Sequence, residues 1–359
     1  MPAATARRWR RWPADPRMRL ILHLGAHKTG TTSIQRILHA NRAWYRERGV
    51  FVPGPDAALK NHNAPHHAFA HGLTGVDPAA KAASVAYAAR ALAKAAAAGA
   101  GCVVLSSEPV FRHIWGTTEF AELRTGDYWE RREAYLRRLK RALDGFETFP
   151  VLVLRRQDEF AESLHLSQRE AGRGVADFRD FLSILAGTMA EYRRQIALLR
   201  DVFGRVRVRS YHRLAASGRL VPAFLEGEGL PVPEPAATVW AYRTPDPRLL
   251  IWMEAMRREA GAKPLRAFVA SPAARAAIAG PRGRMWRDTA ERDAFLARFA
   301  GENAQTEREH PDADGQPFFP APPPVAGSAC VLTDEDRQRL AAAFRCWRQD
   351  VEAGATGSP

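Results

Sequence analysis

The amino-acid sequence predicts an α/β fold in which a mostly parallel β-sheet is flanked by helices and followed by a helical C-terminal part. The main observation is that short apolar runs alternate with longer amphipathic stretches through residues 18–210. Polar or glycine-rich residues follow these runs, and the chain beyond about Gly229 is helical and irregular. Strands that alternate with helices favour parallel pairing, and parallel sheets bind ligands at the carboxyl ends of their strands.

Four apolar segments predict the strands, at residues 18–24, 102–105, 150–154 and 206–210. Helical patterns lie between and after them, at residues 33–48, 78–98, 130–143, 158–170, 177–202 and 333–351. Gly99 and Gly101 separate the second helix from the strand that follows it. The proline-rich residues 311–324 are expected to form an extended surface connection.

A single domain is expected to span residues 18–351. The chain has 359 residues, of which 46% are hydrophobic, and this is enough for a sizeable core. Residues 1–17 are basic and precede the first strand, so we expect a disordered tail there, with Met18 as an alternative translation start. Residues 352–359 are expected to form a second disordered tail.

The chain is strongly basic. Its formal net charge of +14 favours anionic partners such as a nucleotide, an acidic glycan, nucleic acid or an anionic lipid, and charge alone does not choose among them. Nearly all of this charge is arginine, so we attribute part of it to genomic base composition. Nucleic acid is therefore not an expected partner.

Cysteine usage and hydropathy favour a reducing, cytoplasmic location. Cys102, Cys330 and Cys346 form no CxxC pair and no Cys/His spacing of a zinc site. The N-terminal residues lack the apolar core of a secretory signal, and no stretch reaches the roughly 18 apolar residues of a spanning helix. We expect no stable membrane insertion and no metal site.

A glycine loop between the first strand and the first helix predicts a phosphate site of the P-loop type. Gly25 and Gly30 lie five positions apart, as in a Walker A loop, so backbone N–H groups can converge on a phosphate at the helix start. Lys28 precedes the second glycine by two positions, whereas a Walker A lysine follows it. No apolar run ends in an aspartate suited to magnesium, so a donor without a γ-phosphate fits better.

The sequence HLGAHKTGTTS at residues 23–33 resembles the 5′-phosphosulfate loop of PAPS-dependent sulfotransferases, in the bacterial form of the motif. The resemblance implies 3′-phosphoadenosine 5′-phosphosulfate (PAPS) as co-substrate, with no metal required. It implies that Lys28 contacts the 5′-phosphate and neutralises the leaving group during transfer. The other residues assigned to the donor by this loop are His27, Thr29, Gly30, Thr31, Thr32 and Ser33.

The same resemblance implies a second contact with the nucleotide. In sulfotransferases a strand ends in an arginine that is followed eight residues later by a serine, and both bind the 3′-phosphate; Arg155 and Ser163 have this spacing. A guanidinium suits the role because it can hold two phosphate oxygens at once. The adjacent Arg156 is an alternative to Arg155. Tyr211 matches a family position that meets the adenine.

Sulfuryl transfer also needs a base, because the acceptor oxygen loses a proton as it bonds to sulfur. Cytosolic sulfotransferases place a histidine after the strand between the two nucleotide motifs, whereas carbohydrate sulfotransferases use a glutamate as base. This chain has Glu108 at that place, which makes it the first choice, and Ser107 could assist. The alternative bases or acceptor-binding residues are His62, His66 and His67.

The predicted function is therefore transfer of a sulfuryl group from PAPS to a hydroxyl or amine of a glycan, a lipid or a small metabolite. A first alternative is a P-loop kinase or other nucleotide-dependent phosphotransferase, because strand, glycine loop and helix are shared. A second is a non-enzymatic binder of anions or nucleic acid, motivated by the basic charge. The acceptor and the oligomeric state stay open.

Overall fold

The computed structural model describes residues 18–353, apart from residues 27, 60–64, 125, 174, 176, 217, 235–244, 313 and 326–329. Contacts divide the chain into two compact units. The first comprises the described residues of 1–156, 184–241 and 301–320, and the second those of 157–183, 242–300 and 321–359. That residues 18–351 form one domain stays a prediction.

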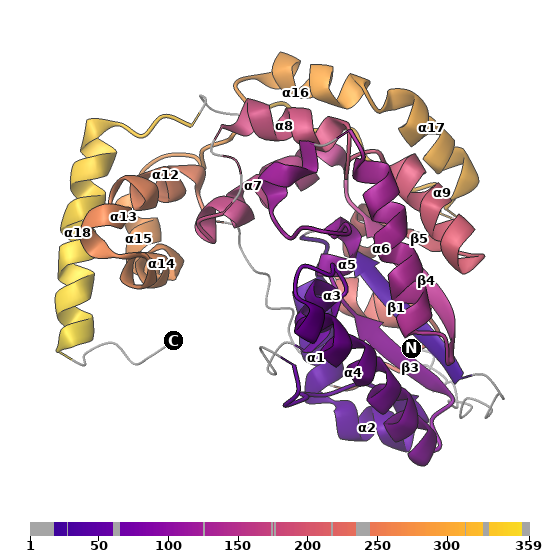
Figure 1. The fold of residues 1–359 in the computed structure, drawn as a ribbon. Coiled ribbons are helices and arrows are strands. Elements are labelled where there is room, and N and C mark those ends of the chain that lie inside the picture. Colours follow the sequence, from indigo (N-terminus) through magenta and orange to yellow (C-terminus); the bar gives the residue numbers. More distant parts are fainter. Residues whose placement is uncertain are drawn as a thin grey trace, which may run out of the picture. The chain divides into compact units, whose positions relative to one another are not determined.

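The first unit contains a five-stranded sheet in which every pairing is parallel (Figure 1). Its strands are β1 (Met18–Gly25), β2 (Val50–Phe51), β3 (Cys102–Ser106), β4 (Phe146–Leu154) and β5 (Arg207–Ser210). Their order is β2-β3-β1-β4-β5, so β1 lies between β3 and β4, where the strand order reverses. The predicted α/β fold is confirmed, and its central strand precedes the glycine loop.

The strands are nearly continuous apolar runs because the central part of the sheet is buried on both faces. Ile21 and Val104 belong to a core with Ile34 and Phe224 on one face. Leu20 and the other alternate residues meet the helices of the opposite face. Alternate side chains of a strand point to opposite faces, so a single run serves two cores.

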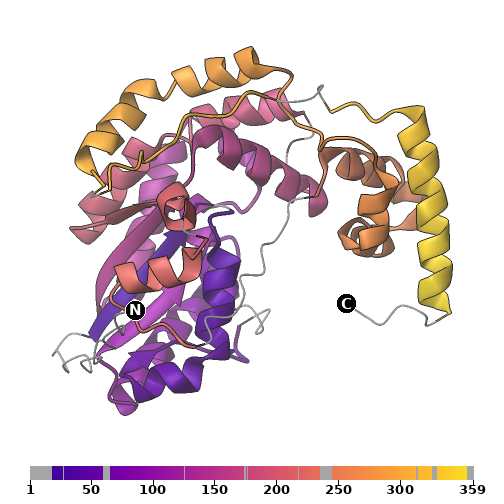
Figure 2. The ribbon, with the colours of Figure 1, turned by 180° about the vertical axis from the view of Figure 1, so that it is seen from behind.

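Helices cover both faces of this sheet. They are α1 (Thr31–Ala40), α2 (Arg42–Glu47), α3 (Pro65–Gly72), α4 (Pro78–Ala97), α5 (Pro109–Arg112), the 3₁₀ helix η1 (Phe120–Arg124), α6 (Tyr128–Ala142), α9 (Tyr192–Phe203), α10 (Tyr211–Ala216) and α11 (Leu220–Gly227), and α17 (Ala300–Glu309) lies mostly in this unit. Helices α4, α6 and α9 pack side by side over one face (Figure 1), whereas α1 and α11 pack on the other (Figure 2).

Two predicted helices are each split in two. The helix predicted at 33–48 ends at Asn41, whose side-chain amide donates to the Ile37 carbonyl, and α2 follows. The helix predicted at 177–202 is α8 (Phe178–Ala186) followed by α9. The break begins at Gly187, a poor helix former, where the Thr188 hydroxyl donates to the Ile184 carbonyl. The two-residue strand β2 was not predicted.

The second unit is helical. It contains α7 (Gln157–Glu170), part of α8, α12 (Pro247–Ala255), α13 (Arg257–Ala260), α14 (Ala262–Ala270), α15 (Pro272–Ala277), α16 (Thr289–Ala297) and α18 (Asp334–Glu352). Its core packs Trp252, Phe268 and Phe344 together with aliphatic side chains of α12, α14 and α18. The predicted helical C-terminal part, including the last helix at 333–351, is confirmed.

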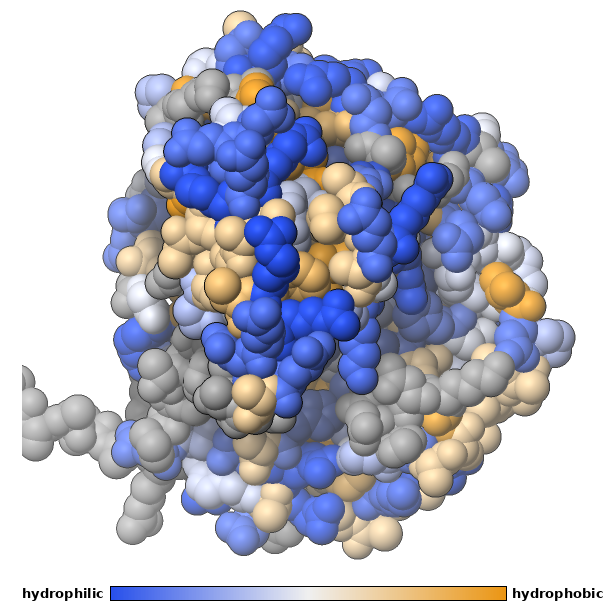
Figure 3. Space-filling view, turned by 90° about the vertical axis from the view of Figure 1, so that its left-hand side faces the viewer, coloured by the Kyte–Doolittle hydropathy of each residue, from blue (hydrophilic) through white to orange (hydrophobic). Residues whose placement is uncertain are grey.

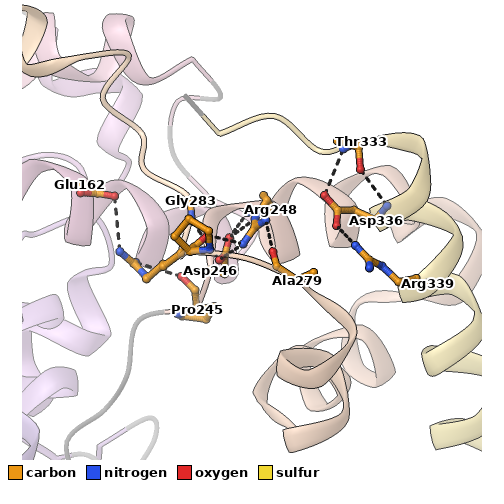
Figure 4. A network of polar contacts seen from close by, with 11 residues as sticks. Glu162, Pro245, Asp246, Arg248, Ala279, Gly283, Thr333, Asp336 and Arg339 are labelled. Carbon is orange, nitrogen blue, oxygen red and sulfur yellow. Dashed lines mark hydrogen bonds and ion pairs between the residues drawn. The ribbon is translucent and has the colours of Figure 1, made fainter. Parts of the chain in front are cut away.

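Carboxylates fix the helix starts in this unit, as Figure 4 shows. Asp246 caps α12 by accepting from the backbone N–H of Arg248, and it also accepts from that residue's guanidinium at 2.9 Å. Thr333 and Asp336 form a reciprocal capping box at the start of α18. Such caps satisfy backbone donors that the first turn of a helix leaves without partners.

The surface is predominantly hydrophilic on the face drawn in Figure 3, where hydrophobic residues occupy smaller areas between hydrophilic ones. Among the described residues the exposed large hydrophobic side chains are Val76, Val85, Val331 and Val351. Within the described part of the chain, no helix has both the length and the apolar character needed to cross a membrane.

Candidate functional site

The loop after β1 has an unusual backbone. Lys28 has a φ of +64°, and among the described residues it is the one non-glycine residue with a positive φ. Gly30 has a φ of +82° and precedes the first turn of α1. A left-handed conformation costs a non-glycine residue about 1–3 kcal/mol and is concentrated at functional sites. His27 lies outside the described residues.

Hydroxyl groups hold this loop together from inside. The Thr29 hydroxyl donates to the Ala26 carbonyl at 2.6 Å and lies 3.5 Å from the hydroxyl of Thr31. Both threonines are buried, and both hydroxyls lie where a Cβ of Gly25 would be. Gly25 is therefore required by space. Thr32, by contrast, is exposed on the first turn of α1.

The N-terminus of α1 carries no side-chain cap. Gly30 has no side chain to accept from the first turn, and no acidic residue lies in that turn. The first intrahelical bond that closes there is from the Ile34 N–H to the Gly30 carbonyl, at 3.1 Å. The amides of Thr31 and Thr32 thus belong to the set that a helix leaves for an external acceptor such as an anion.

The end of β4 brings Arg155 to the loop. The Arg155 guanidinium donates to the Lys28 carbonyl at 3.3 Å and lies 4.9 Å from the centre of the Tyr211 ring. The carbonyl of Arg155 accepts from the Tyr192 hydroxyl at 2.7 Å, which fixes its backbone. Lys28, Arg155 and Tyr211, each selected from the sequence, therefore lie together where three neighbouring strands end.

Arg156 has a different environment from Arg155. It is 5% exposed, and its guanidinium donates to the carbonyl of Pro320 at 3.0 Å. The segment around Phe318 lies against the ends of β4 and β5. The Phe318 carbonyl accepts a hydrogen bond from the Ser210 hydroxyl at the end of β5. Arg156 therefore anchors this segment, whereas Arg155 is directed at the loop. The prediction of an extended connection at 311–324 omitted this anchoring.

The end of β3 places Glu108 near β1, the strand that leads into this loop. Ser107 is buried and is held from two sides, since its N–H donates to the His23 carbonyl and its hydroxyl to the His66 carbonyl, both at 3.0 Å. Glu108 follows as the half-buried first residue of the turn into α5. The Ser107 side chain is thus fixed, and Glu108 is the next residue.

A buried arginine supports the helix that begins at Glu108. Arg132 of α6 donates to the carbonyls of Val110 and His113 at 2.7 and 2.6 Å, and to the side chain of Gln195 at 3.1 Å. It is completely buried. These contacts satisfy carbonyls at the end of the four-residue helix α5, which is too short to be stable without contacts from the rest of the fold.

His23 lies directly beneath the site. Its Nδ1 is 2.8 Å from the Ser106 hydroxyl, and its ring packs on Phe224. Burial lowers the pKa of His23 to about 3, and the Glu108 carboxylate opposes part of this shift. The imidazole is therefore neutral near pH 7.

The structure describes two of the three predicted acceptor histidines, and they differ in burial. His66 is buried, its Nε2 lies 2.5 Å from Nε2 of His39, and burial lowers its pKa to about 3, with the neighbouring histidines adding to the shift. His67 is half-buried on α3. His62 lies outside the described residues. With so low a pKa, the His66 ring is a weak base.

Ser163 is buried in α7, which belongs to the second unit, whereas Arg155 belongs to the first. Each is described within its own unit, and their joint action on one phosphate stays a prediction. In its unit, Ser163 follows Glu162, which contacts the guanidinium of Arg282 at 3.8 Å and accepts from the Met285 N–H.

Comparison with known proteins gives no match to a family model, to a curated protein or to a solved structure. The fold and the site geometry therefore carry the functional argument. Among the described residues, no group of three or more histidine, cysteine, aspartate or glutamate side chains is arranged to hold a metal ion.

Sequence reasoning missed several side chains of this site. His23, Gln35 and Ser106 connect β1, α1 and β3 beneath the loop, where the Gln35 amide donates to the Ser106 carbonyl at 2.9 Å. Of these three residues, only His23 belongs to the recognised loop motif, so only its place in the site could have been predicted from the sequence. Tyr192 and Phe318 reach the site from segments far along the chain, and nothing local to them indicates this.

Proposed function

We propose that this chain is a PAPS-dependent sulfotransferase, which transfers a sulfuryl group to a hydroxyl or amine acceptor. The observation that carries the proposal is the contact between the Arg155 guanidinium and the backbone of Lys28, at 3.3 Å. It means that two cationic residues from neighbouring strands meet at an uncapped helix start. One ligand with two phosphate groups can engage both.

The loop would bind the 5′-phosphosulfate. Amides of the first turn of α1 donate to it, and the Lys28 ammonium neutralises charge on the bridging oxygen. The left-handed backbone of Lys28 supports this role, since its strain has to be compensated by a function or by the surrounding fold. Arg155 would bind the 3′-phosphate, while Tyr211 lies against the guanidinium and borders the adenosine.

Glu108 would act as the base. The acceptor oxygen attacks sulfur, the bond from sulfur to the bridging phosphate oxygen breaks, and the acceptor proton passes to the Glu108 carboxylate. The products are the sulfated acceptor and adenosine 3′,5′-bisphosphate. Glu108 is favoured over His66, because the Nε2 of His66 already contacts His39 and its pKa is lowered to about 3.

Calorimetric titration with adenosine 3′,5′-bisphosphate and with ADP tests the proposal. The 3′-phosphorylated ligand should bind at least 10-fold more tightly, and Arg155→Ala should remove this preference, because a charge-assisted hydrogen bond contributes about 1.5–3 kcal/mol. Arg137→Ala is the matched control, since Arg137 is exposed and paired with Glu133 on α6. No preference in the parent protein, or ADP favoured with magnesium, would reject the donor and point to a kinase.

A further inference from the structure

A second region of the first unit has the features of a ligand site. A cavity of about 840 Å³ lies beside the edge strand β2, between α1 and α2 on one side and α4 on the other. Its volume is in the range of pockets that enclose small molecules. None of the residues assigned to the proposed sulfuryl transfer lines it.

The charge of the cavity wall is strongly positive. Arg42 and Arg46 line it from α2, and Arg90 and Lys94 line it from α4. Each pair is spaced four residues apart, so both members lie on one face of their helix. Among the described residues of the lining, Asp56 is the one acidic side chain. The four cationic side chains and Asp56 together give the lining a net charge of +3.

The arrangement of these side chains is fixed by contacts. Arg90 holds Asp56 through two hydrogen bonds, at 2.8 and 2.9 Å, and this bonding lowers the pKa of the carboxyl. The Arg42 guanidinium occupies the space beside Gly54 where a Cβ would lie. Within the described part of the chain, Arg42, Arg46 and Lys94 form no ion pair. Among the described residues no carboxylate lies within ion-pair distance of these three side chains, and Asp56 acts on Lys94 at longer range.

A buried hydroxyl also borders the cavity. Tyr87 is 3% exposed, and its hydroxyl has no hydrogen-bond partner among the described residues. Its phenol interacts electrostatically with Asp56, Arg42 and Arg90, which also line the cavity. Burial raises the pKa of Tyr87, so the group is a neutral donor. An unsatisfied buried donor of this kind is costly unless a ligand or water accepts from it.

We propose that this cavity binds a small organic molecule with two anionic groups, such as phosphates, on a body of sugar size. The Arg42 and Arg46 pair would hold one group, and Lys94 with Arg90 would hold the other. The site is separate from the loop that binds the nucleotide in the proposed function, so the two can be tested independently.

Calorimetric titration with fructose 1,6-bisphosphate at 150 mM salt tests the proposal, with fructose as the uncharged control. The parent protein should bind the bisphosphate with a Kd below about 1 mM and should not bind fructose. The double variant Arg42→Gln/Lys94→Gln should weaken binding at least about 10-fold. Gly54→Val should also weaken it without changing net charge, because the new side chain displaces the Arg42 guanidinium.

Two matched variants separate a site from general attraction to a basic protein. Arg137→Gln/Arg348→Gln removes the same charge at exposed positions, and Lys28→Ala disables the loop; both should bind the bisphosphate within about 3-fold of the parent. If Arg137→Gln/Arg348→Gln weakens binding as much as the cavity variant does, binding reflects net charge. If Lys28→Ala abolishes binding, the bisphosphate binds at the loop. Either result, or no binding by the parent up to 10-fold above the expected Kd, overturns the proposal.

Discussion

The glycine loop and the cationic cavity would bind anions in different ways. The loop uses the backbone, with amides at the start of α1 and a left-handed Lys28, so its donors belong to consecutive residues. The cavity uses side chains of two helices and of the segment after β2, and Arg42 is separated from Lys94 by 52 positions in the numbering. A backbone site therefore leaves a compact motif in the sequence, whereas a side-chain site leaves none.

The two regions also differ in how their cations are held. Arg155 donates to a carbonyl of the loop itself, so an incoming phosphate competes with a contact within the protein. In the cavity Arg90 is held by Asp56, while the other three cationic side chains form no ion pair within the described residues. We therefore expect ligand binding to reorganise the loop more than the cavity.

Substitution of Glu108 should give the largest effect and should be confined to the loop region. Glu108→Gln should lower kcat about 10²–10⁴-fold, because it removes the base and keeps the size of the side chain. Affinity for adenosine 3′,5′-bisphosphate should change by less than about 3-fold. The measurement is release of this nucleotide from PAPS with a panel of hydroxyl acceptors, and Glu122→Gln, at an exposed position, is the control. An unchanged kcat would show that Glu108 is not the base.

Lys28→Gly should separate charge from backbone strain. It should weaken adenosine 3′,5′-bisphosphate binding about 10- to 100-fold, since the ammonium is lost. It should also raise the free energy of unfolding by about 1 kcal/mol, because glycine adopts a φ of +64° without strain. Calorimetry and urea unfolding measure the two effects. Lys28→Ala is the comparison variant, with weakened binding and no gain in stability, and equal stability of the two would exclude strain at Lys28.

The free energy of unfolding should depend on pH through the two buried histidines that lie near these regions. The folded-state pKa values of His23 and His66 are lowered to about 3, below an unfolded value of 6.5. The unfolded chain therefore binds more protons below pH 6.5, so the stabilisation is complete above that pH and is lost as pH falls toward 3. Between pH 6.5 and 5 the loss is about 2 kcal/mol for each histidine.

Urea unfolding at pH 8 and pH 5 measures this loss, and His23→Asn and His66→Gln should each reduce the pH dependence. His67→Gln is the control, because His67 is half-buried and adjacent. If both single variants keep the full pH dependence of the parent, the two histidines are not the titrating groups.

The smallest effect is expected at Asp56. Asp56→Asn releases Arg90 and removes the one negative charge from the cavity, so affinity for fructose 1,6-bisphosphate should rise about 3-fold. Binding of adenosine 3′,5′-bisphosphate should not change. Titration of both ligands distinguishes the regions, and Asp144→Asn serves as the control at an exposed position. An equal rise in affinity for both ligands would show that both regions respond to the net charge of the protein.

Much of the first unit could be predicted because its signals are local. The apolar runs that become β1, β3, β4 and β5 are visible in the sequence, and so are the longer helices between them, with errors where Asn41 and Gly187 interrupt a helical pattern. The short helices α3 and α5 were not predicted. Strand β2 was missed because two residues, Val50 and Phe51, carry no periodicity. Its pairing with β3 depends on the rest of the sheet.

The candidate site could be predicted only in part, for the same reason. Lys28, Glu108 and Arg155 each lie within three residues of the end of a strand, so the rule that ligands bind at carboxyl ends selects them. His39 and His66 were not expected to pair, because their contact joins the end of α1 to the start of α3. The cationic cavity was invisible for the further reason that arginine is abundant throughout the chain.

The anchoring of residues near Phe318 on the sheet affects how the chain can fold during synthesis. Ser210 binds the Phe318 carbonyl across 108 positions, and Arg156 binds the Pro320 carbonyl across 164. A nascent chain that has completed all five strands still lacks this cover, so the ends of β4 and β5 stay open to solvent and to chaperones until residues 318–320 are synthesised.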